Sequence, residues 1–468
     1  MRVMITVFPA RAHFLPLVPY AWALQSAGHE VCVVAPPGYP TGVADPDFHE
    51  AVTAAGLKSV TCGQPQPLAG PPPPHPLAVH DRDDPGYAAM LPTAAESERY
   101  VAALGISEKE RPTWDVFYHF TLLAIRDYHP PRPRQDVDQV IEFARIWQPD
   151  LVLWDAWFPS GAIAARVSGA AHARVLVAPD YTGWVTERFA AAGPAAGADL
   201  LAETMRPLAE RYGVEVDDDL LLGQWTVNPF PAPMNPPTRL TNVPVRYVPY
   251  TGASVMPAWL YARPSRPRVA LSLGVSARAF LKGDWGRTAK LLEAVAELDI
   301  EVIATLNDNQ LAESGPLPDN VHTLDYVPLD QLLPTCSAVI HHGSTGTFAA
   351  ASAAGLPQVV CDTDEPLLLF GEDTPDGIAW DFTCQKQLTA TLTSRVVTDY
   401  GAGVRVDHQK QSAGQIREQL RRVLTEPSFR EGARRIREDR NSAPSPVELV
   451  SLLVELTKRH RRDKEADR

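Results

Sequence analysis

Short apolar runs alternate with longer amphipathic or small-residue stretches along most of the chain. Residues 2–8 and 30–36 are apolar and rich in β-branched side chains, which is typical of strands buried on both faces of a sheet. Between them, residues 14–28 predict a helix that ends at Gly28. The same strand–helix–strand unit recurs over 150–178. Such alternation predicts a parallel, doubly wound α/β sheet.

The alternation stops at two proline-rich belts and restarts after the second one. Dense prolines exclude a regular helix or a central strand over 64–76, and the second belt spans 228–250. From Val269 strands and helices alternate again, and the end of the chain predicts two or three helices. We therefore predict two doubly wound domains. The predicted boundaries are 1–250 for the N-terminal domain, 251–267 for a linker, 268–442 for the C-terminal domain and 443–468 for a closing helix with a charged, frayed tail.

The composition is that of a soluble globular protein, with 45% hydrophobic and 21% charged residues among 468. A net charge of −13 weighs against a nucleic-acid-binding protein, which usually carries a basic face. The five cysteines are scattered without a C-x-x-C pair, so neither a disulfide framework nor a zinc site is expected. No stretch reaches the ~18 apolar residues of a membrane helix, and the first residues do not resemble a signal peptide. We expect a cytoplasmic protein without a membrane anchor.

The stretch HHGSTGT over 341–347 lies between a predicted strand and a helix of small residues over 345–354. Free backbone N–H groups and the positive end of the helix dipole make such a turn an anion site. Gly343 and Gly346 would let a phosphate approach the backbone closely. Further hydrogen-bond donors are His342, Ser344, Thr345 and Thr347. The alternative is a tight turn whose hydroxyls only cap the helix, and no lysine follows to make a Walker A loop.

Two polar residues are expected at the carboxyl edge of the first sheet, where open α/β sheets bind ligands. His13 follows the first strand, immediately before a helix, and Asp155 ends the strand of the repeated unit. A helix N-terminus disfavours the imidazolium, so His13 is a candidate general base, and Asp155 could orient its ring. Each residue alone could simply cap a helix. The acidic stretches 217–219 and 362–364 are weaker candidates for a divalent metal site.

The chain resembles the family 1 glycosyltransferases of the GT-B fold. The resemblance rests on HHGSTGT with the following GLPQVV and on four further stretches, which together cover nearly the whole chain. These stretches are RVMITVFPARAHFLPLVPYAWALQSAGHEV at the start, LLGQWTVNPFP over 221–231, VRYVPYTGASVMPAWL over 245–260 and RVALSLGVSAR over 268–278. Within that family the combination is similar to actinomycete antibiotic glycosyltransferases, which attach deoxy- and aminosugars to macrolide or anthracycline aglycones.

The resemblance implies two Rossmann-like domains that face a central cleft, with a C-terminal helix that crosses back. It also implies an inverting, metal-independent transfer of a deoxy- or aminodeoxysugar from a TDP-sugar to a polyketide hydroxyl, without a cofactor. His13 would be the catalytic base and Asp155 its partner, and His342 would contact the donor's α-phosphate. The other donor-binding positions that it implies are Gly274, Ser276, Tyr326, Val327, Leu332, Gly343, Ser344, Thr345, Gly346, Thr347 and Asp381, the last of which would hold sugar hydroxyls.

Two regions depart from the simple pattern. The stretch 361–398 is longer than its counterpart in the resembling family, so we expect it to fold partly outside the core and to influence sugar choice. The resembling enzymes work with an auxiliary protein of haem-monooxygenase fold that has lost its haem, and a homodimer is left open. We expect the stretch 64–140 to bury little apolar area and to open locally, which such a helper would counteract. The rival functions are a catalytically silent homologue that binds a sugar nucleotide or an aglycone, and a different sugar-nucleotide enzyme.

Overall fold

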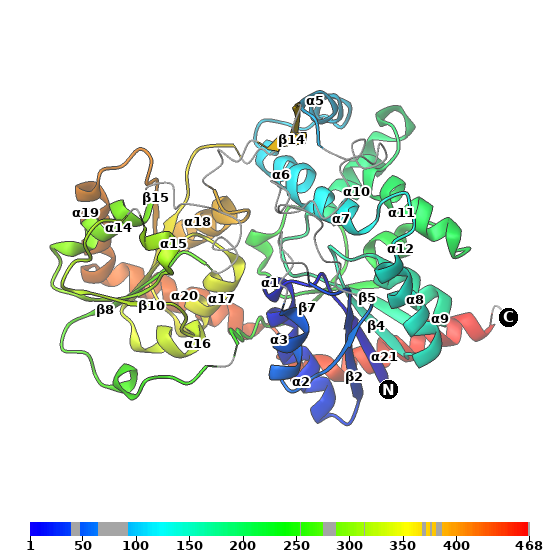
Figure 1. The fold of residues 1–468 in the computed structure, drawn as a ribbon, viewed down its shortest axis with the longest axis horizontal. Helices are drawn as coiled ribbons and strands as arrows, with labels where there is room; N and C mark the ends of the chain where they lie inside the picture. Colours follow the sequence, from blue (N-terminus) through cyan, green and yellow to red (C-terminus); the bar gives the residue numbers. More distant parts are fainter. Residues whose placement is uncertain are drawn as a thin grey trace.

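The computed structural model describes residues 1–38, 47–63, 92–252, 254–274, 287–312, 314–366, 371–374, 377–380 and 386–466. Two α/β lobes lie side by side, and the last helix returns from the second lobe to the first (Figure 1). Each lobe is built on one parallel sheet, so the predicted doubly wound α/β architecture is confirmed.

The sheet of the N-terminal domain has seven parallel strands in the order β3-β2-β1-β4-β5-β6-β7. Its strands are β1 (Arg2–Thr6), β2 (Glu30–Ala35), β3 (Lys58–Thr61), β4 (Leu151–Asp155), β5 (Ala171–Val175), β6 (Trp225–Asn228) and β7 (Asn242–Pro244). The strands β1 and β4 are direct neighbours, with Thr6 opposite Trp154. The two units that the sequence repeats therefore meet in the centre of the sheet.

The helices of this domain are α1 (Arg11–Phe14), α2 (Val18–Ser26), α3 (Phe48–Ala54), α5 (Ala94–Ala103), α6 (Arg111–Val116), α7 (Leu122–Tyr128), α8 (Gln135–Trp147), α9 (Ser160–Ser168), α10 (Tyr181–Ala192), α11 (Leu200–Arg211) and α12 (Asp218–Leu222). Its described residues also form the 3-10 helices η1 (Leu15–Leu17), η3 (Pro194–Ala196) and η4 (Ala232–Met234) and the π-helix η2 (Phe117–Thr121). The helix predicted over 14–28 is divided by η1, because Pro16 cannot donate a backbone hydrogen bond.

The expectation that the stretch 64–140 buries little apolar area is wrong for its described part. Residues 92–140 contribute to a buried aromatic cluster, which we call the α5–α10 cluster. Its main members are Tyr100, Trp114, Phe117, Tyr118, Leu122, Tyr181, Trp184 and Phe189. The fully buried side chains of Trp114 and Phe117 show that tertiary packing compensates for the irregular sequence pattern.

The sheet of the C-terminal domain has six parallel strands in the order β10-β9-β8-β11-β12-β15. They are β8 (Arg268–Ser272), β9 (Glu301–Thr305), β10 (Val321–Leu324), β11 (Ala338–His341), β12 (Gln358–Cys361) and β15 (Gly403–Val406). The hairpin of β13 (Gly371–Thr374) and β14 (Gly377–Trp380) belongs to neither large sheet, as expected for part of the long stretch 361–398.

The helices of the second lobe include α17 (Thr345–Ala354), which has the predicted bounds. The others are α14 (Arg287–Ala296), α15 (Asp308–Leu311), α16 (Leu329–Leu332), α18 (Ala390–Asp399), α19 (Ala413–Thr425) and α20 (Pro427–Ser442), with the 3-10 helices η5 (Ala258–Tyr261) and η6 (Leu333–Thr335).

The last helix, α21 (Pro446–Ala466), packs against α2 and buries Leu449, Val450 and Leu453 in the core of the N-terminal domain. The prediction of a frayed tail is wrong as far as Ala466, because the helix continues to that residue.

Candidate active site between the two domains

His13 and Asp155 meet at the carboxyl edge of the first sheet, as the sequence predicts. His13 lies on the short helix α1 after β1, Asp155 is the last residue of β4, and the two strands are neighbours. The His13 Nδ1 atom lies 2.7 Å from Asp155 Oδ2, and both side chains are buried. A carboxylate only accepts, so Nδ1 is the donor, and in the neutral imidazole Nε2 then keeps its lone pair. This is the tautomer that a general base requires.

The Asp155 carboxylate is fixed by the backbone as well as by His13. The Phe8 N–H group donates to Oδ2 at 3.2 Å, and the Trp157 N–H group donates to Oδ1 at 2.9 Å. Three donors hold the two carboxylate oxygens of Asp155, whose side chain has no exposed surface. The carboxylate can therefore orient the imidazole without moving itself.

The stretch 341–347 forms a strand-to-helix turn at the carboxyl edge of the second sheet. Ser344 is the N-cap of α17, where its hydroxyl accepts a hydrogen bond from the Thr347 N–H group. The capping alternative is therefore confirmed for Ser344, but the first N–H groups of the helix still lack partners within it. Gly343 has a φ of 85°, and a Cβ atom there would lie 2.7 Å from the Ala390 Cα atom. Only glycine fits this turn without displacing α18.

The two adjacent histidines of the turn have different partners. His341 Nδ1 accepts from the Gly343 N–H group, and His341 Nε2 faces the Gln358 side-chain oxygen at 3.0 Å. Both ring nitrogens are thereby used within the fold, and burial lowers the pKa of His341 to about 4. His341 consequently holds the turn rather than a ligand.

His342 lies against the loop that follows β8. Its Nδ1 atom is 3.4 Å from the Ser272 carbonyl oxygen, and burial, followed by the charge of Arg287 and by His341, lowers its pKa to about 3. Gly274 has a φ of 84°, and a Cβ atom at that residue would lie 2.4 Å from His342 Nε2. Gly274, one of the predicted donor-binding positions, thus provides the space that the His342 ring occupies.

Residues before and within α18 hold the 341–347 turn in place through the Gly343 carbonyl oxygen. The sequence did not predict these contacts. The hydroxyl groups of Thr389 and Thr393 donate to the Gly343 carbonyl oxygen at 2.9 and 2.8 Å. Gln387 Oε1 in turn accepts a hydrogen bond from the Thr389 N–H group and lies 2.8 Å from the Thr389 hydroxyl oxygen. The only signal in the sequence is the polar run before the helix. These contacts place the beginning of α18 beside the turn that precedes α17.

The remaining predicted donor-site residues fall into three groups. Tyr326 is partly exposed, with its hydroxyl next to Gly252 of the linker, whereas the side chains of Val327 and Leu332 are packed in a buried cluster. Only the backbones of Val327 and Leu332 can therefore meet a nucleotide base. At Gly346 a Cβ atom would meet only the Tyr247 hydroxyl, at 3.9 Å, so this face of α17 is open. Ser276 and Asp381 lie outside the described residues.

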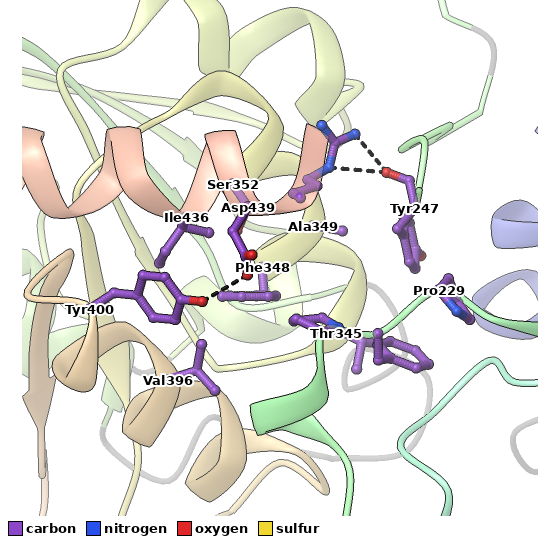
Figure 2. A pocket seen from close by; sticks show the side chains of 13 residues that line it. Pro229, Tyr247, Thr345, Phe348, Ala349, Ser352, Val396, Tyr400, Ile436 and Asp439 are labelled. Atoms are coloured by element: carbon purple, nitrogen blue, oxygen red, sulfur yellow. Dashed lines mark hydrogen bonds between the residues drawn. The ribbon is translucent and has the colours of Figure 1, made fainter. Parts of the chain in front are cut away.

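The N-terminal domain contacts the helix α17 through a small apolar pocket, and Figure 2 shows Tyr247, Thr345 and Phe348 around it. Arg440 at the end of α20 donates two hydrogen bonds, of 3.1 and 2.6 Å, to the Tyr247 carbonyl oxygen (Figure 2). Leu388, just before α18, and Leu392, on α18, pack against the α5–α10 cluster of the first lobe. The donor-side helices are thus connected to the domain that carries His13.

In the acidic stretches considered for a metal site, Asp362 pairs with cationic side chains, and Asp217 pairs with an arginine and caps a helix. Asp362 accepts from Arg405 at 2.9 Å and lies 3.2 Å from Lys386 Nζ. Asp217 caps α12 and pairs with Arg166. Within the described ranges, no group of three or more histidine, cysteine, aspartate or glutamate residues is arranged to hold a metal ion. These carboxylates therefore have structural roles.

The chain matches both domains of the family described as "Erythromycin biosynthesis protein CIII-like", the N-terminal domain over 22–274 and the C-terminal domain over 289–374 and 382–456. It is 40% identical over 477 residues to aclacinomycin-T 2-deoxy-L-fucose transferase of Streptomyces galilaeus. That alignment covers 100% of this chain and 98% of the relative. It is also 38% identical over 474 residues to 10-deoxymethynolide desosaminyltransferase of Streptomyces venezuelae. That alignment covers 99% of this chain and 98% of the relative.

Solved structures share the fold over almost the whole chain. Glycosyltransferase VinC, solved in complex with dTDP, matches with a TM-score of 0.73 and 29% identity, covering 98% of this chain and 100% of VinC. Spinosyn forosaminyltransferase SpnP matches with a TM-score of 0.72 and 32% identity, covering 98% of this chain and 99% of SpnP. Across the described residues, every helix is too short or too polar to cross a lipid bilayer.

Proposed function

The chain belongs to the erythromycin biosynthesis protein CIII-like family of GT-B glycosyltransferases, and we propose that it transfers a deoxy- or aminodeoxysugar from a TDP-sugar to a hydroxyl of a polyketide-type aglycone. Its relatives support the sugar class and the aglycone class, since they include aclacinomycin-T 2-deoxy-L-fucose transferase and 10-deoxymethynolide desosaminyltransferase. VinC was solved with dTDP, which supports a thymidine diphosphate donor here.

The observation that carries the proposal is the buried His13–Asp155 pair, whose Nδ1 and Oδ2 atoms lie 2.7 Å apart. In the proposed inverting step, Nε2 takes the proton of the acceptor hydroxyl as that oxygen attacks the anomeric carbon. The bond between that carbon and the β-phosphate oxygen breaks, and the electron pair leaves with TDP. Asp155 stabilises the imidazolium that forms.

The charge that develops on the leaving diphosphate is stabilised from the second domain. The N-terminus of α17, with the turn that Gly343 makes, supplies backbone N–H groups and the positive end of a ten-residue helix. His342 would add a contact to the α-phosphate, as the family resemblance implies. We propose that this cradle replaces a divalent metal, because Asp362 and Asp217 are already neutralised by arginine and lysine side chains.

Purified protein incubated with a panel of TDP-deoxysugars and macrolide or anthracycline aglycones tests the proposal. We expect TDP release and a glycoside of inverted anomeric configuration, with the same rate in the presence of EDTA. A chelator-sensitive rate restored by Mg²⁺ would contradict metal independence. Donor binding without TDP release, with every aglycone and with a candidate helper, would favour the silent homologue.

An auxiliary protein of haem-monooxygenase fold remains part of the proposal, supported by the resemblance to helper-dependent transferases. Weak packing no longer argues for it, because residues 92–140 contribute to the buried α5–α10 cluster. Activity assays with and without such a helper test whether a helper is needed. Sedimentation analysis of the purified protein tests whether it forms a homodimer. Full turnover of the monomer alone would remove the helper and the dimer from the account.

A further inference from the structure

Aromatic side chains surround the His13 ring, and they have no part in the chemistry described so far. The ring centroid of Trp157 lies 4.7 Å from that of His13, with an angle of 63° between the planes. The Phe8 ring lies 5.1 Å away at 36°, and Phe8 and Trp157 touch edge-on at 6.3 Å. The three rings form one contact group, in which Trp157 is 5% and Phe8 2% exposed.

The hydrogen bond to Asp155 orients the His13 ring by restraining one atom, Nδ1. The ring is also tethered through Cβ, so the motion left to it is a small coupled rotation about its χ1 and χ2 bonds. Nε2 lies on the far side of the ring from this hydrogen bond, so such rotations change the direction of its lone pair. The carboxylate itself does not turn, because the Phe8 and Trp157 N–H groups hold its two oxygens. The remaining freedom of His13 is therefore limited by the neighbouring rings.

We propose that Trp157 is a positioning residue, whose indole fixes the rotation of the His13 ring so that Nε2 points to the acceptor hydroxyl. The inference rests on the proposed function, since it concerns the direction of the base in that reaction. Trp157 makes the closest ring contact with His13, and its backbone also fixes the partner carboxylate. Trp157 thus contacts both members of the pair: its ring contacts His13, and its backbone N–H group holds the Asp155 carboxylate.

The backbone bond survives any substitution of the side chain, so the role of the indole can be tested separately. Trp157→Phe keeps an aromatic face beside His13, whereas Trp157→Met keeps an apolar side chain of comparable length without a ring. The matched control is Trp147→Met, because Trp147 stacks on Phe143 of the helix α8 and is partly exposed. Turnover, the KM for the donor and melting temperature are measured for all three variants.

We expect Trp157→Phe to retain turnover within about 3-fold of the wild type and Trp157→Met to lose about 30-fold, because small misplacements of a catalytic group are costly. The donor KM should stay unchanged in both variants, and Trp147→Met should turn over like the wild type. Equal turnover of Trp157→Phe and Trp157→Met would overturn the proposal. A loss that scales with melting temperature across the three variants would also overturn it.

A second readout does not depend on activity. The proton on His13 Nδ1 should give a downfield NMR resonance that is sharp in the wild type and in Trp157→Phe but broadened or absent in Trp157→Met. An unchanged resonance in Trp157→Met would overturn the positioning role. If the wild type transfers no sugar, the proposed function fails, whereas this resonance still decides the role of Trp157.

Discussion

At the residue scale, two adjacent histidines illustrate how environment assigns different tasks to one residue type. His341 uses both ring nitrogens within the fold, towards Gly343 and Gln358. His342 places Nδ1 3.4 Å from the Ser272 carbonyl oxygen, and it lies beside the open turn. The repeated HH in the sequence therefore contains one structural residue and one candidate ligand.

We predict that His342→Ala weakens TDP binding by about 1.5–3 kcal/mol, the usual contribution of a hydrogen bond to a charged group. Isothermal titration calorimetry with TDP measures the change. His322→Ala is the control, because His322 is an exposed residue of β10 in the same domain. Wild-type affinity in His342→Ala would show that the backbone of the turn binds the diphosphate without this side chain.

Sequence reasoning found the His13–Asp155 pair although 142 residues separate its members. Asp155 ends β4 and His13 follows β1, the neighbouring strand of the same parallel sheet, so the topology brings them to one edge. Trp157 lies in the stretch that contains Asp155, yet its role was not predicted, because it depends on where the His13 ring lies in space. Likewise, the contact of Thr389 with Gly343 joins segments of the chain whose relative position no local pattern specifies.

At the element scale, the loop after β8 and the turn before α17 are packed together. Gly274→Ala would strain a φ of 84° and place a Cβ atom 2.4 Å from His342 Nε2. We expect TDP affinity to fall by about 10-fold or more, in addition to ~1 kcal/mol of lost stability from the backbone strain. Calorimetric titration and chemical unfolding measure the two effects.

Gly28→Ala is the control that separates the loss of TDP affinity from the loss of stability. Gly28 has a φ of 81°, but no atom lies within 4 Å of the position that its Cβ would take. It should lose a similar amount of stability without any change in TDP affinity. Equal TDP affinity in both glycine variants would contradict the contact between Gly274 and His342.

The elements that were predicted correctly have strong local patterns. The β1–α2–β2 unit and α17 have clear apolar strands, glycine ends and small-residue helices. The π-helix η2 and the hairpin β13–β14 were not predicted as such. The sequence TPDG at the junction of β13 and β14 is typical of a turn, but the short runs on either side of it have no clear strand pattern. No local pattern distinguishes η2 from an ordinary helix, and its side chains pack in the buried α5–α10 cluster.

At the scale of the whole molecule, buried imidazoles predict sensitivity to acid. Burial lowers the pKa of His129 and His341 to about 4 and of His342 to about 3, from 6.5. Between pH 6.5 and those values the unfolded chain binds more protons than the folded chain, so the free energy of unfolding falls as the pH falls. Asp115 acts in the opposite direction, because burial raises its pKa to about 6.

Melting temperatures measured from neutral to mildly acidic pH in wild type and in His129→Gln test this prediction. His129 lies between the Ile125 carbonyl oxygen and the Ser160 N–H group, in a buried position of the N-terminal domain. The variant should lose less stability on acidification than the wild type. An identical pH dependence of the two proteins would show that His129 does not titrate as its burial implies.

The central claim is that the two domains have different roles: the N-terminal domain carries the general base, and the C-terminal domain binds the diphosphate. The most direct measurement is turnover and TDP affinity of His13→Ala and His342→Ala, determined on the same preparations. The account predicts that His13→Ala loses about 10²-fold or more in turnover with unchanged TDP affinity, and that His342→Ala loses TDP affinity. Near-wild-type turnover in His13→Ala, or an equal loss of TDP affinity in both variants, would contradict it.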